Sequence, residues 1–434
     1  MSTPYASMSQ LLARIGADAG AMHVDQVHAL LRALAQPVAE TETLPLHQAL
    51  GRVLAADVHS PVDVPPHDNS AMDGYAFAGR LLAAGGDITL PVAGTVLAGN
   101  PWQGDVPAGC ALRIMTGAML PAGLDTVVPF ELCQVDAAAS TVRFDTAKLR
   151  PGANRRQRGE ELAAGATALP AGTRLGAAEL GLAAGLGLPQ LTVRRPLRVA
   201  LFSTGDELLQ PGDAARSGAI YDSNRFALAA ALQQLGCSVQ DLGAVRDEPA
   251  ALRATLQQAA QSADVILTSG GVSSGDADHT QTLLAELGDV AFLRIAMRPG
   301  RPMAVGRMRA ADGQPGALLL GLPGNPVAAL LSFALLARPA LLQAMGMDAA
   351  HATPALLQVP LAAPLRKRAG RTEFVRATLR ASTQGLIEAR PTGNQSSAML
   401  SSLVQADAVL LLEHDQSDLA AGTLVRALPL HCLL

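Results

Sequence analysis

The sequence predicts a multidomain α/β plus β protein. Its centre is a doubly wound, mostly parallel α/β domain, joined to an inserted small β domain, an elongated body of helical and extended segments, and a C-terminal β-barrel-like domain. From residue 197 onward, short apolar runs alternate with helical patterns. Residues 88–147 and those after 351 contain only short strand-like runs between turn residues. The length of 434 residues also suggests about three domains.

Composition excludes several classes of protein. Hydrophobic residues make up 49% and charged residues 16%, so the chain is not globally disordered. The net charge of −4 gives no electrostatic basis for a nucleic-acid partner. Four scattered cysteines, no signal peptide and no lipid anchor indicate a cytoplasmic protein with reduced thiols. The longest apolar segment, 327–337, is too short to cross a bilayer and is expected to be a buried helix, so no membrane partner is predicted.

The N-terminal residues predict two helices joined by a short extended piece between about 26 and 56. Apolar residues recur there at helical spacing, at Leu30, Leu31, Leu34, Leu50, Val53 and Leu54. Residues 60–75 are dense in proline and carboxylates and lack periodicity, which predicts a rigid polar loop.

A small β module is predicted between residues 88 and 147, where β-branched runs alternate with Gly, Pro and Asp. One turn in it places Thr116 beside Gly117. A basic cluster of Arg155, Arg156 and Arg158 follows, which is more typical of a solvated face than of a ligand site. Because helical patterns flank the module, it is predicted to be an insertion. The expected domains are 1–60 with 148–195 (body), 61–147 (insert), 196–348 (α/β) and 349–434 (C-terminal β).

The α/β region predicts a parallel sheet with helices on both faces. Strands are expected at 197–203, 238–242, 264–267, 291–295 and 317–320, and helices at 223–235, at 249–260, after His279 and after Pro326. Asp222 or Ser223 is the expected N-cap of the first helix. In such sheets, ligands bind outside the carboxyl ends of the strands.

Five polar or glycine-rich loops follow these predicted strands. They are Thr204-Gly205-Asp206-Glu207, Arg246-Asp247-Glu248, 268–280, Arg298-Pro299-Gly300-Arg301-Pro302 and Gly321-Leu322-Pro323-Gly324-Asn325-Pro326. The carboxyl ends of parallel strands share one edge, so these loops are expected to converge. They bring anion-binding amides, two guanidinium groups, a helix N-terminus and carboxylates suited to a hard divalent ion.

The loop 268–280 reads TSGGVSSGDADHT. Its glycines let backbone amides gather around an oxyanion. Asp276 and Asp278 would repel that anion, so a metal ion or a cationic partner is implied. An ordinary Gly/Ser loop is the alternative. After about residue 351, strands are expected at 372–381, 385–389, 408–413 and 424–428.

Seven motifs in one order resemble a known family. They are DNSAMDGYA (68–76), IMTGA (114–118), RRQRGE (155–160), STGDEL (203–208), YDSNR (221–225), TSGGVSSGDAD (268–278) and GLPGNPV (321–327). Through these motifs the sequence resembles the molybdopterin molybdenumtransferase family over nearly its whole length. This family is also similar to the gephyrin E domain.

The resemblance implies an elongated homodimer whose active sites lie between the α/β domain of one subunit and the inserted region of the other. It implies that adenylylated molybdopterin and molybdate give the molybdenum cofactor and AMP with the help of Mg²⁺. Contacts with molybdopterin adenylyltransferase and with acceptor molybdoenzymes are also implied.

Site residues follow from the resemblance and from the strand-end loops together. The expected catalytic residues are Asp73, Thr116, Glu207, Asp247 and Asp278, of which Glu207, Asp247 and Asp278 are the expected metal ligands. The expected substrate-binding residues are Ser269, Gly270, Gly271, Ser273, Arg298, Arg301, Pro323, Gly324, Asn325 and Pro326. Of Asp276 and Asp278, the match favours Asp278.

Two departures from the family pattern stand out. Arg298 and Arg301 occupy positions where relatives usually carry lysine; the positive charge is kept, but arginine differs in reach and hydration. His67 lies where relatives often have an aromatic residue, and it is expected to be a surface residue. Two other functions remain open: molybdopterin adenylyltransferase, which the extra β domains disfavour, and a gephyrin-like scaffold without catalysis.

Overall fold

The computed structural model describes residues 6–17, 20–272, 277–310, 315–348, 352, 354–382 and 385–434, without the side chains of 277–279 and 315. The chain forms two compact units. Unit 1 comprises Met1–Ala55, Gly172–Gly176 and Leu191–Leu434, and unit 2 comprises Ala56–Ala171 and Ala177–Gln190. The finer division into four domains stays a prediction.

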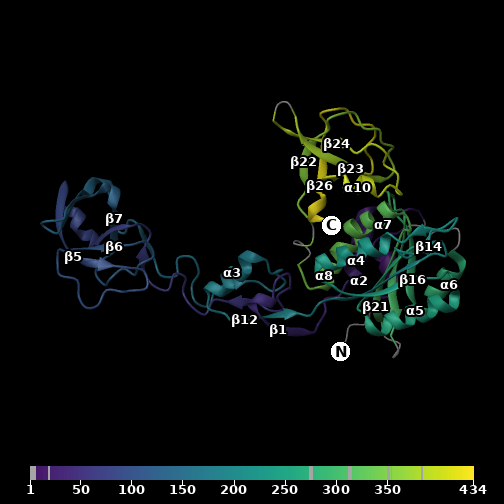
Figure 1. Cartoon of the computed structure of the whole chain (residues 1–434), viewed down its shortest axis with the longest axis horizontal. Coiled ribbons are helices and arrows are strands. Elements are labelled where there is room, and N and C mark those ends of the chain that lie inside the picture. The colour runs from purple at the N-terminus through teal and green to yellow at the C-terminus, as the bar shows by residue number, and fades with distance from the viewer. Residues whose placement is uncertain are drawn as a thin grey trace. The chain divides into compact units, whose positions relative to one another are not determined.

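A six-stranded sheet forms the centre of unit 1 (Figure 1). Its strands, in order across the sheet, are β16 (Ser238–Val245), β13 (Arg198–Thr204), β17 (Val265–Ser269), β21 (Pro315–Leu322), β20 (Pro302–Arg309) and β18 (Gly288–Arg294). The first four are parallel, and β20 runs antiparallel to both of its neighbours. Sequence analysis missed β20, because Pro302, Gly306 and two arginines interrupt its apolar pattern.

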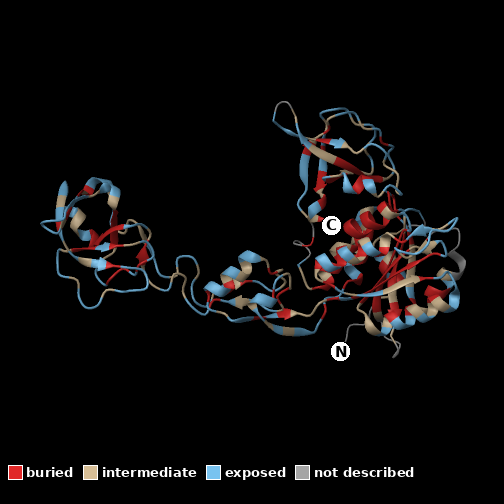
Figure 2. Ribbon diagram, in the orientation of Figure 1, coloured by how far each residue is buried: buried red, intermediate tan, exposed pale blue. Residues whose placement is uncertain are grey.

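Helices cover both faces of this sheet, because its central strands are apolar on both sides. In β13, Val199 and Leu201 pack into one core with α2 (Val24–Leu34), α4 (Asn224–Leu235) and α7 (Pro326–Ser332). Ala200 and Phe202, which point the other way, pack into a second core with α5 (Pro249–Ser262) and α6 (Ala277–Leu287). Figure 2 shows these strands as continuously buried. The predicted doubly wound α/β fold is confirmed.

One helix of the described residues is long and apolar enough to cross a membrane, namely Pro326–Ala344, with 19 residues. Sequence analysis underestimated it, because α7, a π-helical turn (Phe333–Ala337) and α8 (Arg338–Ala344) are continuous. The wider turn accommodates Pro339, which lacks the N–H that a regular α-helix needs. The expected buried helix is confirmed, since 83% of its most apolar window is buried inside the protein.

The N-terminal part of unit 1 contains α1 (Met8–Arg14) and α2, followed by β1 (Thr41–Pro45), which pairs with β12 (Gln190–Arg194). The second helix predicted before residue 56 is wrong. Leu50 is 65% exposed, whereas Val53 and Leu54 are buried in extended backbone that forms bridges to Arg174 and Val193. These long-range bridges override the local helical spacing.

The C-terminal part of unit 1 is a curved sheet. Its order is β19 (Met297–Arg298), β23 (Thr372–Ala381), β25 (Ala408–Leu412), β26 (Leu424–Pro429) and β22 (Leu357–Pro360), with β24 (Ile387–Pro391) on β23. A bridge between Leu361 and Ala389 brings the two ends of the sheet together, in keeping with the barrel-like prediction. Because β19 belongs to the connection after β18, this sheet is hydrogen-bonded to the central domain. The remaining short elements of unit 1 are β14 (Leu208–Leu209), β15 (Ile220–Tyr221) and α10 (Ser401–Val404).

Unit 2 is built on a second six-stranded sheet. Its order is β7 (Thr126–Pro129), β4 (Gly74–Phe77), β6 (Ala111–Ile114), β5 (Asp87–Val96), β9 (Thr141–Asp145) and β8 (Gln134–Asp136). The other elements are β2 (Val58–His59) with β11 (Thr167–Leu169), β3 (Asn69–Ser70) with β10 (Arg155–Arg156), and α3 (Ala177–Gly185). The prediction of a polar loop at 60–75 is therefore wrong for β3 and for the start of β4. These residues form strands because they pair with distant parts of the chain.

Candidate active site

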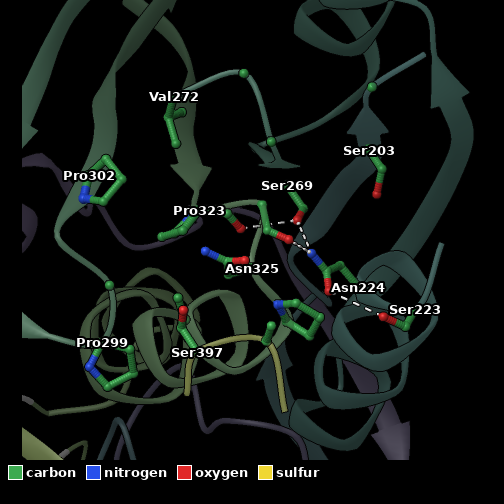
Figure 3. Close-up of a pocket in the computed structure, with 18 of the residues that line it drawn as sticks. Ser203, Ser223, Asn224, Ser269, Val272, Pro299, Pro302, Pro323, Asn325 and Ser397 are labelled. Carbon is green, nitrogen blue, oxygen red and sulfur yellow. Dashed lines mark hydrogen bonds between the residues drawn. The ribbon is translucent and has the colours of Figure 1, made fainter. Parts of the chain in front are cut away.

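A pocket of about 1630 Å³ lies where the strand-end loops of the central sheet meet (Figure 3). Residues from all five predicted loops line it. The residues from our predicted set are Glu207, Asp247, Ser269, Gly270, Gly271, Arg298, Arg301, Pro323, Gly324, Asn325 and Pro326. The structure thus brings together most of the residues that sequence analysis expected at this edge of the sheet.

Neighbouring atoms lie so close to three backbone positions of the pocket that only glycine fits there. Gly270 has a φ of +95°, and a Cβ there would lie 2.5 Å from the backbone oxygen of Thr204. Gly271 has a φ of +68° and also faces Thr204, whose buried hydroxyl has no partner among the described residues. At Gly205 a Cβ would lie 2.6 Å from a carboxylate oxygen of Glu207. Glycine therefore lets two strand ends and one carboxylate share a small volume.

Asn224, at the start of α4, holds two pocket loops together. Its side-chain amide donates to the hydroxyl of Ser269 at 2.8 Å and to the backbone oxygen of Gly324 at 2.7 Å. The Ser269 hydroxyl in turn donates to the Pro323 oxygen at 3.3 Å, and Figure 3 shows this chain of bonds. The loops after β17 and β21 are consequently fixed relative to each other.

A buried ionic network supports the start of α4. Asp222 accepts from the backbone N–H of Arg225 at 3.1 Å and from the hydroxyl of Ser203 at 3.2 Å. The Arg225 guanidinium pairs with Asp222 at 3.0 Å and also contacts Asp241 and Gln210. Ser223 occupies the N-cap position without a capping bond from its side chain, so Asp222 supplies the capping acceptor.

Three arginines give the pocket its positive charge. Arg298 and Arg301 are exposed, and neither forms an ion pair with a carboxylate of the described residues. Arg371, which was not predicted, joins them from the C-terminal sheet, although it also pairs with Glu373 at 2.8 Å. Residues 394–398, in the loop between β24 and α10, complete this side of the pocket. Guanidinium groups in such a setting suit an oxyanion.

The carboxylates of the pocket lie on the other strand ends. Asp206, Glu207, Asp222 and Asp247 line it, and Asp206 accepts from the Asp247 backbone N–H at 3.3 Å. Among the described residues, no group of three or more His, Cys, Asp or Glu is placed to hold a metal ion. Mg²⁺ usually takes one or two carboxylates and completes its shell with water and substrate phosphates. The donors present therefore fit Mg²⁺ only as an ion shared with substrate.

Three predicted or discussed residues of the glycine-rich loop cannot be placed. Ser273 and Asp276 lie outside the described residues. The backbone of Asp278 lies in α6, but its side chain is outside the described part of the chain. Its role as a metal ligand stays a prediction.

Asp73 and Thr116 lie together in unit 2. The backbone N–H and the hydroxyl of Thr116 both donate to one oxygen of Asp73, each at 2.7 Å. These bonds, together with the charge of Arg113, lower the pKa of Asp73. The carboxylate is thus held ionised in a fixed orientation, with its second oxygen unused by these bonds.

The basic cluster of unit 2 is engaged by carboxylates. Arg155 pairs with Asp68 at 3.4 Å and Arg158 with Asp63 at 2.5 Å. The Arg158 backbone N–H also donates to Asp68 at 2.8 Å. These contacts fit the expected solvated, structural role of the cluster.

Sequence analysis missed two groups of pocket residues. Asp222, Ser223 and Asn224 lie in the motif 221–225, and their polar side chains before a helix were a usable signal. Arg371 and residues 394–398 gave no such signal, because only the fold of the C-terminal sheet brings them to the pocket.

Comparison with known proteins identifies the family. Three family models match: "MoeA N-terminal region (domain I and II)" at 22–187, "Probable molybdopterin binding domain" at 200–343, and "MoeA C-terminal region (domain IV)" at 358–430. Molybdopterin molybdenumtransferase of Haemophilus influenzae is 38% identical, over 91% of this chain and 95% of that protein. Molybdopterin molybdenumtransferase 2 of Mycobacterium tuberculosis is 38% identical over 88% and 93%.

Gephyrin of Dictyostelium discoideum is 30% identical over 90% of this chain but only 59% of its own length. Among solved structures, the molybdopterin biosynthesis MoeA protein of Pyrococcus horikoshii has a TM-score of 0.70 at 28% identity, over 94% of this chain and 98% of that one. The predicted resemblance and the predicted enzyme class are confirmed. The chain belongs to the molybdopterin molybdenumtransferase family, the MoeA proteins of molybdenum cofactor biosynthesis.

Proposed function

We propose that this enzyme inserts molybdenum from molybdate into adenylylated molybdopterin, releasing the molybdenum cofactor and AMP. The observation that carries the proposal is one pocket with three arginines, Arg298, Arg301 and Arg371, facing strand ends rich in glycine and carboxylates. Both molybdate and the phosphates of the pterin substrate are oxyanions that guanidinium groups and backbone amides bind well. The volume of about 1630 Å³ suits a large nucleotide-containing ligand.

Binding and positioning account for most of the chemistry that this chain supplies. Arg298 and Arg301 would hold molybdate and phosphate, and the amides of Gly270 and Gly271 would hold a second phosphate oxygen. Asn224 bonds to the loops after β17 and β21, so it would hold the amides of Gly270 and Gly271 in place for the substrate.

Glu207 and Asp247, with Asp278, would hold Mg²⁺ jointly with the substrate phosphates. When bound, the ion would supply positive charge that neutralises the pyrophosphate. Without it, these carboxylates would repel the substrate, which is why a cation is part of the proposal.

Asp73 is proposed to act across a homodimer. By the resemblance, Asp73 and Thr116 of the partner subunit would complete the pocket of unit 1. Its lowered pKa keeps Asp73 an acceptor at neutral pH, suited to ordering a water molecule bound to molybdate or to the metal.

The proposal places the enzyme in the cytoplasm, without nucleic-acid or membrane partners. All four cysteines are free thiols, as a reducing compartment would keep them. Contacts with molybdopterin adenylyltransferase, which supplies the adenylylated substrate, and with acceptor molybdoenzymes belong to the same proposal.

The direct test mixes purified protein with adenylylated molybdopterin, Mg²⁺ and molybdate and measures AMP. We expect AMP release that requires molybdate. No AMP release would favour a scaffold, and formation of adenylylated molybdopterin from ATP would favour an adenylyltransferase. An Asp278→Ala variant that released AMP at the parent rate would exclude Asp278 as a metal ligand.

The shared site has its own test. A mixture of the Asp73→Asn and Arg298→Met variants should be more active than either variant alone, because each mixed dimer would contain one intact site. If subunits exchange, as shown by mass spectrometry of tagged chains, and the mixture is no more active than either variant, the site is not shared.

A further inference from the structure

Arg376, on β23 of the C-terminal sheet, is a fully buried guanidinium that pairs with no carboxylate in the part of the chain that the structure describes. Its exposed fraction is 0%, and its Nε and Nη1 atoms have no hydrogen-bond partner among the described residues. Burial, and then the charge of Arg298, lower its pKa. A buried, unpaired cation is costly, so its presence needs a physical reason.

The hydrogen bonds of the Arg376 guanidinium all go to one segment, residues 394–396, while the Arg376 backbone oxygen also accepts from Thr392. Its Nη2 atom donates to the backbone oxygens of Asn394 at 3.3 Å and Ser396 at 3.0 Å. The side chain of Gln395 accepts from the Arg376 N–H at 3.0 Å and donates to the Arg376 oxygen at 3.1 Å. Arg376 therefore fixes this segment through both its side chain and its backbone.

The same segment lines the pocket, whereas Arg376 itself does not. The oxygens of Asn394 and Ser396 point to Arg376, and the oxygen of Ser397 accepts from the Val327 N–H of α7 at 2.9 Å. Three backbone oxygens of this segment that would repel an anion are thereby engaged by groups that do not line the pocket. The hydroxyl of Ser397 lies on the pocket side (Figure 3).

We propose that Arg376 is a positioning residue for an oxyanion. It holds the carbonyl groups of Asn394 and Ser396 away from the pocket and places a buried positive charge behind them, so that this segment and Arg298 can bind molybdate. The inference rests on the proposed function, because molybdate is taken as the oxyanion. The bound anion would supply the negative charge that Arg376 lacks.

The test measures molybdate binding by isothermal titration calorimetry at low salt, where charge effects are least screened. Arg376→Met keeps the length of the side chain and removes its charge and donors. Arg376→Lys keeps the charge but loses the planar fork. Arg380→Met, on the same strand, is the matched control: it also removes one positive charge, but Arg380 is exposed and pairs with Asp407 at 2.6 Å.

We expect Arg376→Met to raise the Kd for molybdate about tenfold, Arg376→Lys about threefold, and Arg380→Met not measurably. At a molybdate concentration near the Kd of the parent, molybdate should raise the Tm of the parent and of Arg380→Met clearly, and that of Arg376→Met much less. The Tm of Arg376→Met without molybdate should equal or exceed that of the parent, because a buried unpaired charge has been removed.

Other outcomes separate the possibilities. Binding by the parent with an unchanged Kd in both Arg376 variants would overturn the inference and leave the proposed function intact. A lower Tm without molybdate and an unchanged Kd would show a purely structural role and also overturn it. If Arg376→Met does not fold, Arg376→Lys decides the question. An unchanged Kd in Arg376→Lys would then overturn the inference. Absence of molybdate binding by the parent would overturn both this inference and the proposed function.

Discussion

The pocket of unit 1 and the Asp73–Thr116 pair of unit 2 are built in different ways. The pocket takes residues from the ends of many strands and crowds its glycines against neighbouring backbone. The pair in unit 2 is one carboxylate held by one neighbouring turn. We infer that unit 1 provides binding and unit 2 provides a single oriented acceptor. Changes in the two regions should therefore differ in kind.

The largest effect is expected from Arg298→Met. Loss of this exposed guanidinium from the pocket should lower kcat/KM for molybdate about 100-fold and weaken molybdate binding in parallel. Initial rates of AMP release and calorimetry measure the two quantities. Arg294→Met, an exposed arginine of the preceding strand, is the control and should match the parent.

Asp73→Asn should lower kcat about tenfold to hundredfold while leaving the Kd for molybdate unchanged. The substituted amide keeps the shape and an acceptor for Thr116, so the Tm should also stay the same. If this variant bound molybdate as weakly as Arg298→Met, the division into a binding region in unit 1 and an oriented acceptor in unit 2 would be wrong.

Two glycine substitutions test the difference in packing. Gly270→Ala should lower the free energy of unfolding by about 3 kcal/mol, since the new Cβ meets the Thr204 oxygen and φ is positive. Gly117→Ala, next to Thr116, should lower it by about 1 kcal/mol, because φ is positive but the space is open.

The single tryptophan, Trp102, lies in unit 2, so it separates the two transitions. Urea unfolding followed by its fluorescence should shift for Gly117→Ala only. Circular dichroism follows both units and should also shift for Gly270→Ala. A fluorescence shift in Gly270→Ala would mean that the units do not unfold independently.

The smallest effect is expected from Thr116→Val. The Thr116 backbone N–H and then its hydroxyl hold the pKa of Asp73 below its usual value. Loss of the hydroxyl raises that pKa, so activity that needs ionised Asp73 should disappear at a higher pH as the medium is acidified. The rise is partial because the backbone bond remains. A pH–kcat profile that is shifted in Thr116→Val, but restored in Thr116→Ser, would confirm the role of the hydroxyl.

Local sequence patterns predicted the position of the pocket where it depends on strand ends. The five loops after the predicted strands do meet at one pocket, because parallel strands place their carboxyl ends together. The contribution of Arg371 and residues 394–398 was not predictable in this way. It depends on β19 pairing with β23, a contact between distant parts of the chain that no local periodicity encodes.

The misassigned elements have the same cause. Residues 50–54 have helical spacing, but bridges to Arg174 and Val193 hold Val53 and Leu54 extended. The strands β4 and β20 were missed because neighbours on both sides impose an extended conformation on sequences rich in Gly, Pro or charge. The seven ordered motifs carried the family assignment despite these errors.

The bond from the Val327 N–H to the Ser397 oxygen has a consequence for synthesis on the ribosome. The central sheet and the helix that begins at Pro326 leave the exit tunnel before Ser397 has been made. The Val327 N–H, in the first turn of that helix, therefore lacks this acceptor until Ser397 has been made, and the side of the pocket formed by residues 394–398 is the last to be completed. If molybdate binds on this side of the pocket, as we propose, a nascent chain would be unable to hold it until the C-terminal sheet has folded.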